Sequence, residues 1–88
     1  MNDPLDFQLS QHAIHRLQER QEIKLEWIKQ VMKSPEFTQQ DPQDPQLKQV
    51  YARIAENGGR VLKVVYNAYV TPYRIVTVYF DRTMEKKL

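Results

Sequence analysis

The spacing of hydrophobic residues in this chain changes once, near Leu47. Before that point, apolar residues recur every three or four positions, as in amphipathic helices. After it, apolar and polar residues alternate, which is typical of strands with one buried face. Pro and Asp residues are concentrated in the segment 35–46 between the two parts. This order predicts an α+β domain in which helices cover one face of a sheet.

Two short helices are predicted in the first part. Ser10 is suited to cap a helix over residues 11–20, and Pro35 ends a second helix over residues 25–33. Ile23 is expected to fill the space between them. The expected buried residues are Ala13, Ile14 and Leu17 on the first helix, and Leu25, Ile28, Val31 and Met32 on the second, with Trp27 on its flank.

An antiparallel meander of three strands is predicted over residues 47–54, 61–70 and 74–81. Asn57, Gly58 and Gly59 suit the positive φ angles of a tight hairpin. Residues 7–9 and 36–40 are candidates for edge strands. The expected fold class is therefore α+β, with two N-terminal helices packed on one face of a small antiparallel sheet.

The 88 residues allow one domain, residues 1–88, with a core over about residues 7–81 and short flexible termini. The absence of cysteine excludes a disulfide framework, a thiolate zinc site and a cysteine nucleophile. No signal peptide and no apolar stretch of roughly 20 residues is visible. These features predict a cytoplasmic protein that does not associate with membranes.

The positive charge of the chain lies in its second half. Residues 47–88 carry eight basic and three acidic side chains, whereas residues 35–46 carry three acidic ones and residues 1–34 are neutral. This asymmetry indicates a polyanion or an acidic protein as partner. Ordinary solubilising charges would produce the same pattern.

Basic residues form a row on the first predicted helix, at His12, Arg16 and Arg20. A histidine transfers protons near neutral pH, and two arginines in one row can bind phosphates. The alternative is that His12 is a boundary residue and that the arginines bond to backbone or to carboxylates of the second helix. His12 and His15 lack a third metal ligand, so neither a metal nor a cofactor is expected.

A second candidate site is the sheet face that points away from the helices. Val50, Ala52, Ile54, Leu62, Val64, Tyr66, Val76, Val78 and Phe80 are expected to face the helices. The opposite face would then carry Tyr51, Arg53, Lys63, Thr77 and Tyr79. Cations interleaved with tyrosines suit RNA, because rings stack on bases and cations hold phosphates. An ordinary solvated sheet face would also be polar.

Several enzyme classes lack their residues in this chain. Its two glycines both lie in the predicted hairpin, so there is no Gly-rich phosphate loop. There is also no acidic cluster for a two-metal nuclease and no clear Ser–His–Asp set. Nucleotide-driven and acyl-transfer enzymes are therefore not expected.

Three segments together resemble the domain-of-unknown-function 4258 family. They are Ser10-x-His12-Ala13-x-x-Arg16-Leu17-x-x-Arg20 with Ile23 and Ser34-Pro35 after it, then Val61-Leu-Lys-Val-Val65, then Arg74-Ile-Val-Thr-Val-Tyr79. That family is grouped by fold with the RelE/ParE and BrnT type toxins of bacterial toxin–antitoxin pairs. The resemblance implies a RelE-like fold and a ribonuclease. Glu22 stands where the family commonly has a glycine.

The resemblance also implies site residues. His12, Arg16 and Arg20 match the polar helix row of the family, and Arg53, Lys63 and Tyr79 match basic and tyrosyl positions on the strands of RelE-like toxins. The expected catalytic residues are His12, Arg16, Arg20, Arg53 and Tyr79, and the expected RNA-binding residues are Tyr51, Lys63, Arg74 and Thr77.

The resulting hypothesis is a toxin-like protein that cleaves RNA without a metal. A base would deprotonate the ribose 2′-hydroxyl, arginines would stabilise the charge on phosphorus, and an acid would protonate the leaving 5′-oxygen. His12 is the first candidate for proton transfer, followed by Tyr79 and Lys63. RNA or the ribosome, a cognate antitoxin and a second copy of the chain are the expected partners. The alternative is a non-catalytic module that binds protein or nucleic acid, and a third possibility is an inactive relic of a toxin.

Overall fold

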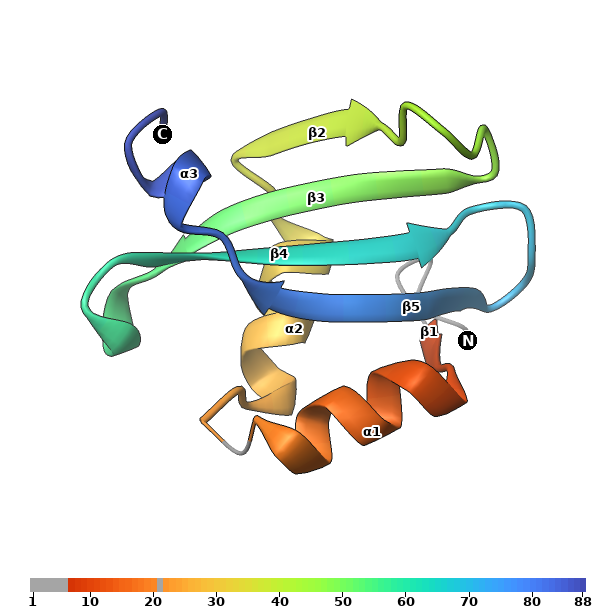
Figure 1. The fold of residues 1–88 in the computed structure, drawn as a ribbon, viewed down its shortest axis with the longest axis horizontal. Coiled ribbons are helices and arrows are strands. Elements are labelled where there is room, and N and C mark those ends of the chain that lie inside the picture. The colour runs from red at the N-terminus through yellow and green to blue at the C-terminus, as the bar shows by residue number, and fades with distance from the viewer. Residues whose placement is uncertain (1–6, 21) are drawn as a thin grey trace.

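A computed structural model describes residues 7–20 and 22–88 and shows an α+β fold (Figure 1). The elements in chain order are β1 (Phe7–Leu9), α1 (Gln11–Glu19), α2 (Leu25–Lys33), β2 (Phe37–Gln40), β3 (Leu47–Ile54), a 3₁₀ turn η1 (Ala55–Asn57), β4 (Arg60–Asn67), β5 (Tyr73–Phe80) and α3 (Arg82–Glu85). No helix in the described part of the chain has the length and apolar character needed to cross a membrane.

The five strands form one sheet in the order β1-β5-β4-β3-β2. The meander β3-β4-β5 is antiparallel, as predicted, and β2 extends it in the same sense. The expectation of an antiparallel sheet is wrong at the other edge, because β1 pairs with β5 in parallel. Both candidate edge strands are confirmed. The sheet is mixed because β1 runs in the same direction as its neighbour β5, whereas the other neighbouring strands run in opposite directions.

Helix α2 supplies the centre of the core, which it forms with β3 and β4. Its side chains Ile28, Val31 and Met32 are buried as predicted. The Trp27 ring is also buried and meets the Phe80 ring edge-on, with centroids 6.2 Å apart. This contact turns the buried helix face toward Trp27. Leu25, predicted to be buried, is therefore 48% exposed.

Helix α1 lies along β5 and β1 at the margin of the sheet (Figure 1). Ser10 caps it as predicted, since its hydroxyl accepts a hydrogen bond from the Ala13 amide at 3.0 Å. Ala13 is buried and Leu17 packs against the core, but Ile14 is 39% exposed. A helix at the sheet margin covers only a narrow stripe, so the predicted burial of Ile14 is wrong. Ile23, between the helices, is buried as expected.

A β-bulge changes which residues of β5 face the helices. The pairing of β4 with β5 shifts between Val65 and Tyr66, where Val65 lies opposite Thr77 and Tyr66 opposite Ile75. Val76 is therefore the extra residue of the bulge. Ile75 joins the core in place of Val76, which was predicted to face the helices, whereas Val78 and Phe80 are core residues as expected.

The turn between β3 and β4 and the two terminal segments were also predicted from the sequence. Gly58 and Gly59 have φ angles of 67° and 74°, as predicted for the hairpin between β3 and β4, but Asn57 ends the 3₁₀ turn η1 and does not have the predicted positive φ. The expected flexible C-terminal segment instead forms α3, which packs against β4 on the face opposite α1 and α2 (Figure 1). The expected flexible N-terminal segment, residues 1–6, lies outside the described residues.

We expect the I28A substitution to lower the free energy of unfolding by about 2–5 kcal/mol, because it leaves a cavity between α2 and the sheet. The matched control is I14A, which removes the same atoms from an exposed position and should cost less than about 1 kcal/mol. Urea denaturation followed by circular dichroism measures both. Equal losses in the two variants would contradict the assigned core.

Candidate functional site

Four side chains form a row across the sheet on the face opposite α1 and α2, which we call the open face. The strand register places Phe37 opposite Tyr51, Tyr51 opposite Lys63, and Lys63 opposite Tyr79. These four residues are the cross-strand row. It aligns two phenols and a phenyl ring with one cation, so that groups able to stack and groups able to bind an anion lie side by side.

Lys63 occupies the space between the two tyrosines. Its Nζ lies 5.5 Å from the centroid of the Tyr51 ring and 5.2 Å from that of Tyr79. Partial burial lowers the pKa of Lys63, but contact with the Tyr79 hydroxyl and the favourable electrostatics of both phenols outweigh it, so the net pKa lies above the ordinary value of 10.5. Lys63 is therefore a cation at neutral pH and cannot accept a proton there.

A hydrogen-bonded network of amides holds Tyr51 beside Lys63. The Tyr51 hydroxyl donates to Gln49 Oε1 at 3.0 Å and accepts from Gln39 Nε2 at 3.0 Å. Gln39 Nε2 also donates to Gln49 Oε1 at 2.8 Å. Gln49 is only 7% exposed, and its Nε2 donates to Asp41 Oδ2 at 2.9 Å. We call Gln39, Asp41, Gln49 and Tyr51 the amide network.

Asp41 ends the amide network as an ionised carboxylate. The backbone amides of Gln43 and Asp44 donate to its Oδ1, each at 2.9 Å. These two backbone bonds, followed by the Gln49 amide and by the charge of Lys63, lower the pKa of Asp41 below the ordinary value of 3.8 despite opposition from burial. The same carboxylate thus orders the acidic connector after β2 and orients Gln49.

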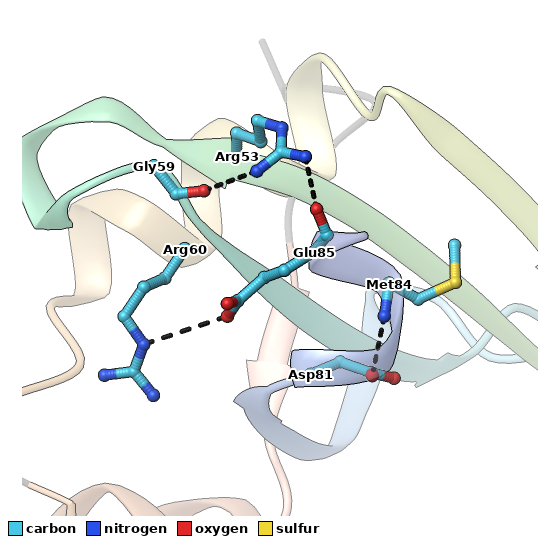
Figure 2. A network of polar contacts seen from close by, with 6 residues as sticks. All are labelled: Arg53, Gly59, Arg60, Asp81, Met84 and Glu85. Carbon is cyan, nitrogen blue, oxygen red and sulfur yellow. Dashed lines mark hydrogen bonds and ion pairs between the residues drawn. The ribbon is translucent and has the colours of Figure 1, made fainter. Parts of the chain in front are cut away.

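Arg53 also lies on the open face but contacts the chain's own backbone (Figure 2). Its guanidinium donates to the carbonyl oxygens of Gly59 at 2.8 Å and Glu85 at 2.6 Å, and to that of Leu88. The carboxylate of Glu85, which lies on the short helix α3, is 3.9 Å from Arg60 Nε on β4. Arg53 was expected to bind phosphate, but its donors hold α3 against the hairpin instead.

The profile of the family described as domain of unknown function (DUF4258) matches residues 9–80. The chain belongs to this family. No curated protein and no solved structure gave a significant match. The matched range of this DUF4258 domain begins at the last residue of β1 and ends with β5, so it contains the cross-strand row and leaves out α3.

The structure separates the helix row of this DUF4258 domain from the cross-strand row. His12 is exposed on α1 and Arg20 is exposed at its C-cap, on the side of the sheet that carries the core. Arg16 is half-buried, and its Nε has no partner among the described residues. Lys63 and Tyr79 point to the opposite face. The three helix residues therefore do not join Lys63 and Tyr79 in a single catalytic site.

The remaining predicted residues take different positions on β3 and β5. Tyr51 is 2% exposed, so its ring offers no free face for a base, and the expectation that it stacks on RNA is wrong. Neighbouring side chains of β2 and the adjacent Lys63 cover it. Thr77 is half-buried on the open face opposite Val65, and Arg74 is exposed beside Asn67 at the start of β5.

Sequence reasoning missed Phe37, Gln39, Asp41 and Gln49 as members of this site. Two signals were present: Phe37 and Gln39 alternate along a candidate edge strand, and Asp41 precedes a proline in a turn. Within residues 7–20 and 22–88, no three His, Asp or Glu side chains cluster closely enough to hold a metal ion.

We expect R53M to release α3 and to lower the free energy of unfolding by about 2 kcal/mol, because charged hydrogen bonds to three carbonyls are lost. R74M removes an exposed arginine and should change stability by less than about 0.5 kcal/mol. Urea denaturation reports stability, and hydrogen exchange of residues 82–88 reports release. Unchanged exchange in R53M would refute the assigned role.

The lowered pKa of Asp41 predicts a contribution to stability that is present above about pH 4 and is lost as the pH falls through the folded-state value. The D41N variant should therefore lose less stability than the wild type between about pH 5 and pH 2. Carbon-13 NMR titration of the Asp41 carboxyl measures the pKa directly. A midpoint at or above 3.8 would contradict the network.

Proposed function

We propose that this DUF4258 domain is an RNA-directed, toxin-like protein that binds RNA on its open face and cleaves it without a metal. The observation that supports this proposal most strongly is the Lys63 ammonium between the Tyr51 and Tyr79 rings, 5.5 Å and 5.2 Å from their centroids. A cation held on a sheet face beside Tyr79 suits the phosphates of RNA, and the buried Tyr51 supports Lys63 rather than stacking on a base.

Lys63 is the phosphate-binding group in this proposal. Its raised pKa keeps it protonated, so it stabilises negative charge on the phosphate and on the pentacoordinate intermediate. Tyr79 lies beside it and carries a hydroxyl that can donate a proton. Because the Tyr51 hydroxyl is already engaged as a hydrogen-bond donor to Gln49 Oε1, we assign proton transfer to Tyr79.

The proposed reaction is transesterification within the RNA. The ribose 2′-oxygen loses its proton to solvent and attacks the adjacent phosphorus, while the bond from phosphorus to the 5′-oxygen breaks. Tyr79 protonates the leaving oxygen, and the products are a 2′,3′-cyclic phosphate and a 5′-hydroxyl. Atoms and electrons balance without an oxidant or a cofactor.

The toxin part of the proposal rests on the resemblance to RelE/ParE-like proteins together with the α+β architecture. Under this proposal the protein acts in the cytoplasm, and RNA or the ribosome is its partner. A cognate antitoxin would cover the open face with an acidic or amphipathic segment, which complements the positive charge of residues 47–88.

The second candidate function is a binding module without catalysis. Two observations favour it. The Arg53 guanidinium donates its hydrogen bonds to backbone carbonyls, and His12 lies on the side of the sheet opposite the open face. In that case, RNA or a protein partner would bind the open face and leave unchanged.

We expect K63M to weaken binding of a single-stranded RNA oligomer about tenfold, because one charged phosphate contact is lost. Fluorescence anisotropy at fixed salt measures the affinity. K48M is the matched control, because Lys48 is an exposed lysine of β3 that pairs with Tyr66 and not with Lys63. This variant should change binding less than about twofold.

Cleavage is tested by induced expression in a bacterial host and by incubation of the protein with RNA, with and without ribosomes and with a chelator present. We expect growth arrest, cyclic phosphate ends, and a rate lowered about 100-fold or more in Y79F. H12A should still cleave. RNA binding without cleavage would refute the nuclease and support the binding module. If the protein neither binds nor cleaves RNA, then RNA is not the partner in either function.

A further inference from the structure

The amide network has a direction that is set at one end. Asp41 is ionised at neutral pH and can only accept hydrogen bonds, so Gln49 must turn its Nε2 toward it. Gln49 Oε1 then faces the other way and accepts from both Tyr51 and Gln39. An amide flip in Gln49 would bring two oxygen acceptors together at Asp41.

This direction extends to the exposed edge strand β2. Gln39 must donate with Nε2, because its partner atom Gln49 Oε1 is an acceptor. The other end of the same amide, Gln39 Oε1, receives no hydrogen bond from any residue of 7–20 and 22–88. Gln39 is an exposed residue of β2, and because its Nε2 is bound to Gln49 and Tyr51, its carbonyl oxygen is the end of the amide left for a ligand.

An exposed aromatic ring lies beside this acceptor. Phe37 is two residues before Gln39 on the same face of β2 and is 38% exposed. Its ring rests against the Tyr51 ring with centroids 5.6 Å apart, which restricts its orientation. A phenyl ring supported in this way offers a stacking surface for a base.

We propose that Phe37 and Gln39 form a base-recognition subsite, in which the base stacks on Phe37 and donates its exocyclic amino group to Gln39 Oε1. This inference rests on the proposed function, because it names the part of RNA that the open face distinguishes. Within the cross-strand row, Phe37 then binds a base, and Lys63, two strands away, binds a phosphate.

A fixed acceptor distinguishes cytosine from uracil. Cytosine carries an amino donor where uracil carries a carbonyl oxygen. The one N–H on the pairing edge of uracil lies between two carbonyl oxygens, whose repulsion weakens a hydrogen bond from it to Gln39 Oε1. The subsite therefore selects amino-bearing bases over uracil.

The test compares octamers of cytidine and of uridine by fluorescence anisotropy at one salt concentration. We expect the wild type to bind the cytidine octamer about fivefold more tightly. Q39L should bring this ratio close to one. F37L should weaken binding of both octamers, by up to about tenfold. Q43L, which removes an exposed glutamine of the connector, is the matched control and should keep the wild-type ratio.

The D41N variant tests whether the amide network, and not only the presence of Gln39, sets the preference for cytidine. Asparagine can donate to Gln49, so Gln49 and Gln39 are free to turn, and the preference for cytidine should fall although Gln39 is intact. A wild type that binds both octamers equally, or a ratio that Q39L leaves unchanged, would overturn the subsite while Lys63-dependent RNA binding stands. Binding of neither octamer would overturn the proposed function as well.

Discussion

The register of the three central strands is the constraint on which the rest of the structure depends. Because side chains alternate along β3, β4 and β5, one pairing register sends Ala52, Leu62 and Val64 to the helices and Tyr51 and Lys63 to the other side. Helix α2 buries the apolar face through Trp27 and Ile28. A slip by one residue would exchange core and open face, so the apolar packing of α2 also maintains the cross-strand row.

The open face is ordered by polar groups rather than by packing alone. Tyr51 is almost fully buried, and its hydroxyl is satisfied within the amide network, which ends at the ionised Asp41. A buried polar group of this kind would be costly if it were left unpaired. The network therefore keeps Tyr51 beside Lys63 and, at its exposed end, orients Gln39. Arg53, on the same face, stabilises α3 instead.

Much of the local structure was predictable because it depends on short-range chemistry. Ser10 caps a helix, Gly58 and Gly59 turn a hairpin, and alternation marks the strands. The errors lie where distant segments meet. The burial of Trp27 in place of Leu25 depends on Phe80, and the exclusion of Val76 depends on a bulge in the pairing of β4 with β5. The candidate site was predictable in part: Lys63 and Tyr79 follow from alternation, but the roles of Arg53 and Gln49 do not.

The amino-acid sequence by itself determined the α+β class, the bounds of α2, the meander and the presence of a polar sheet face, because periodicity and turn residues act over a few positions. Only the tertiary structure decided which groups on that face are available. His12 was set apart from Lys63 by the sheet, Arg53 was engaged by carbonyls more than 30 residues away in the chain, and Gln39 was turned by Asp41 through Gln49. Availability depends on contacts between distant segments, which periodicity does not encode.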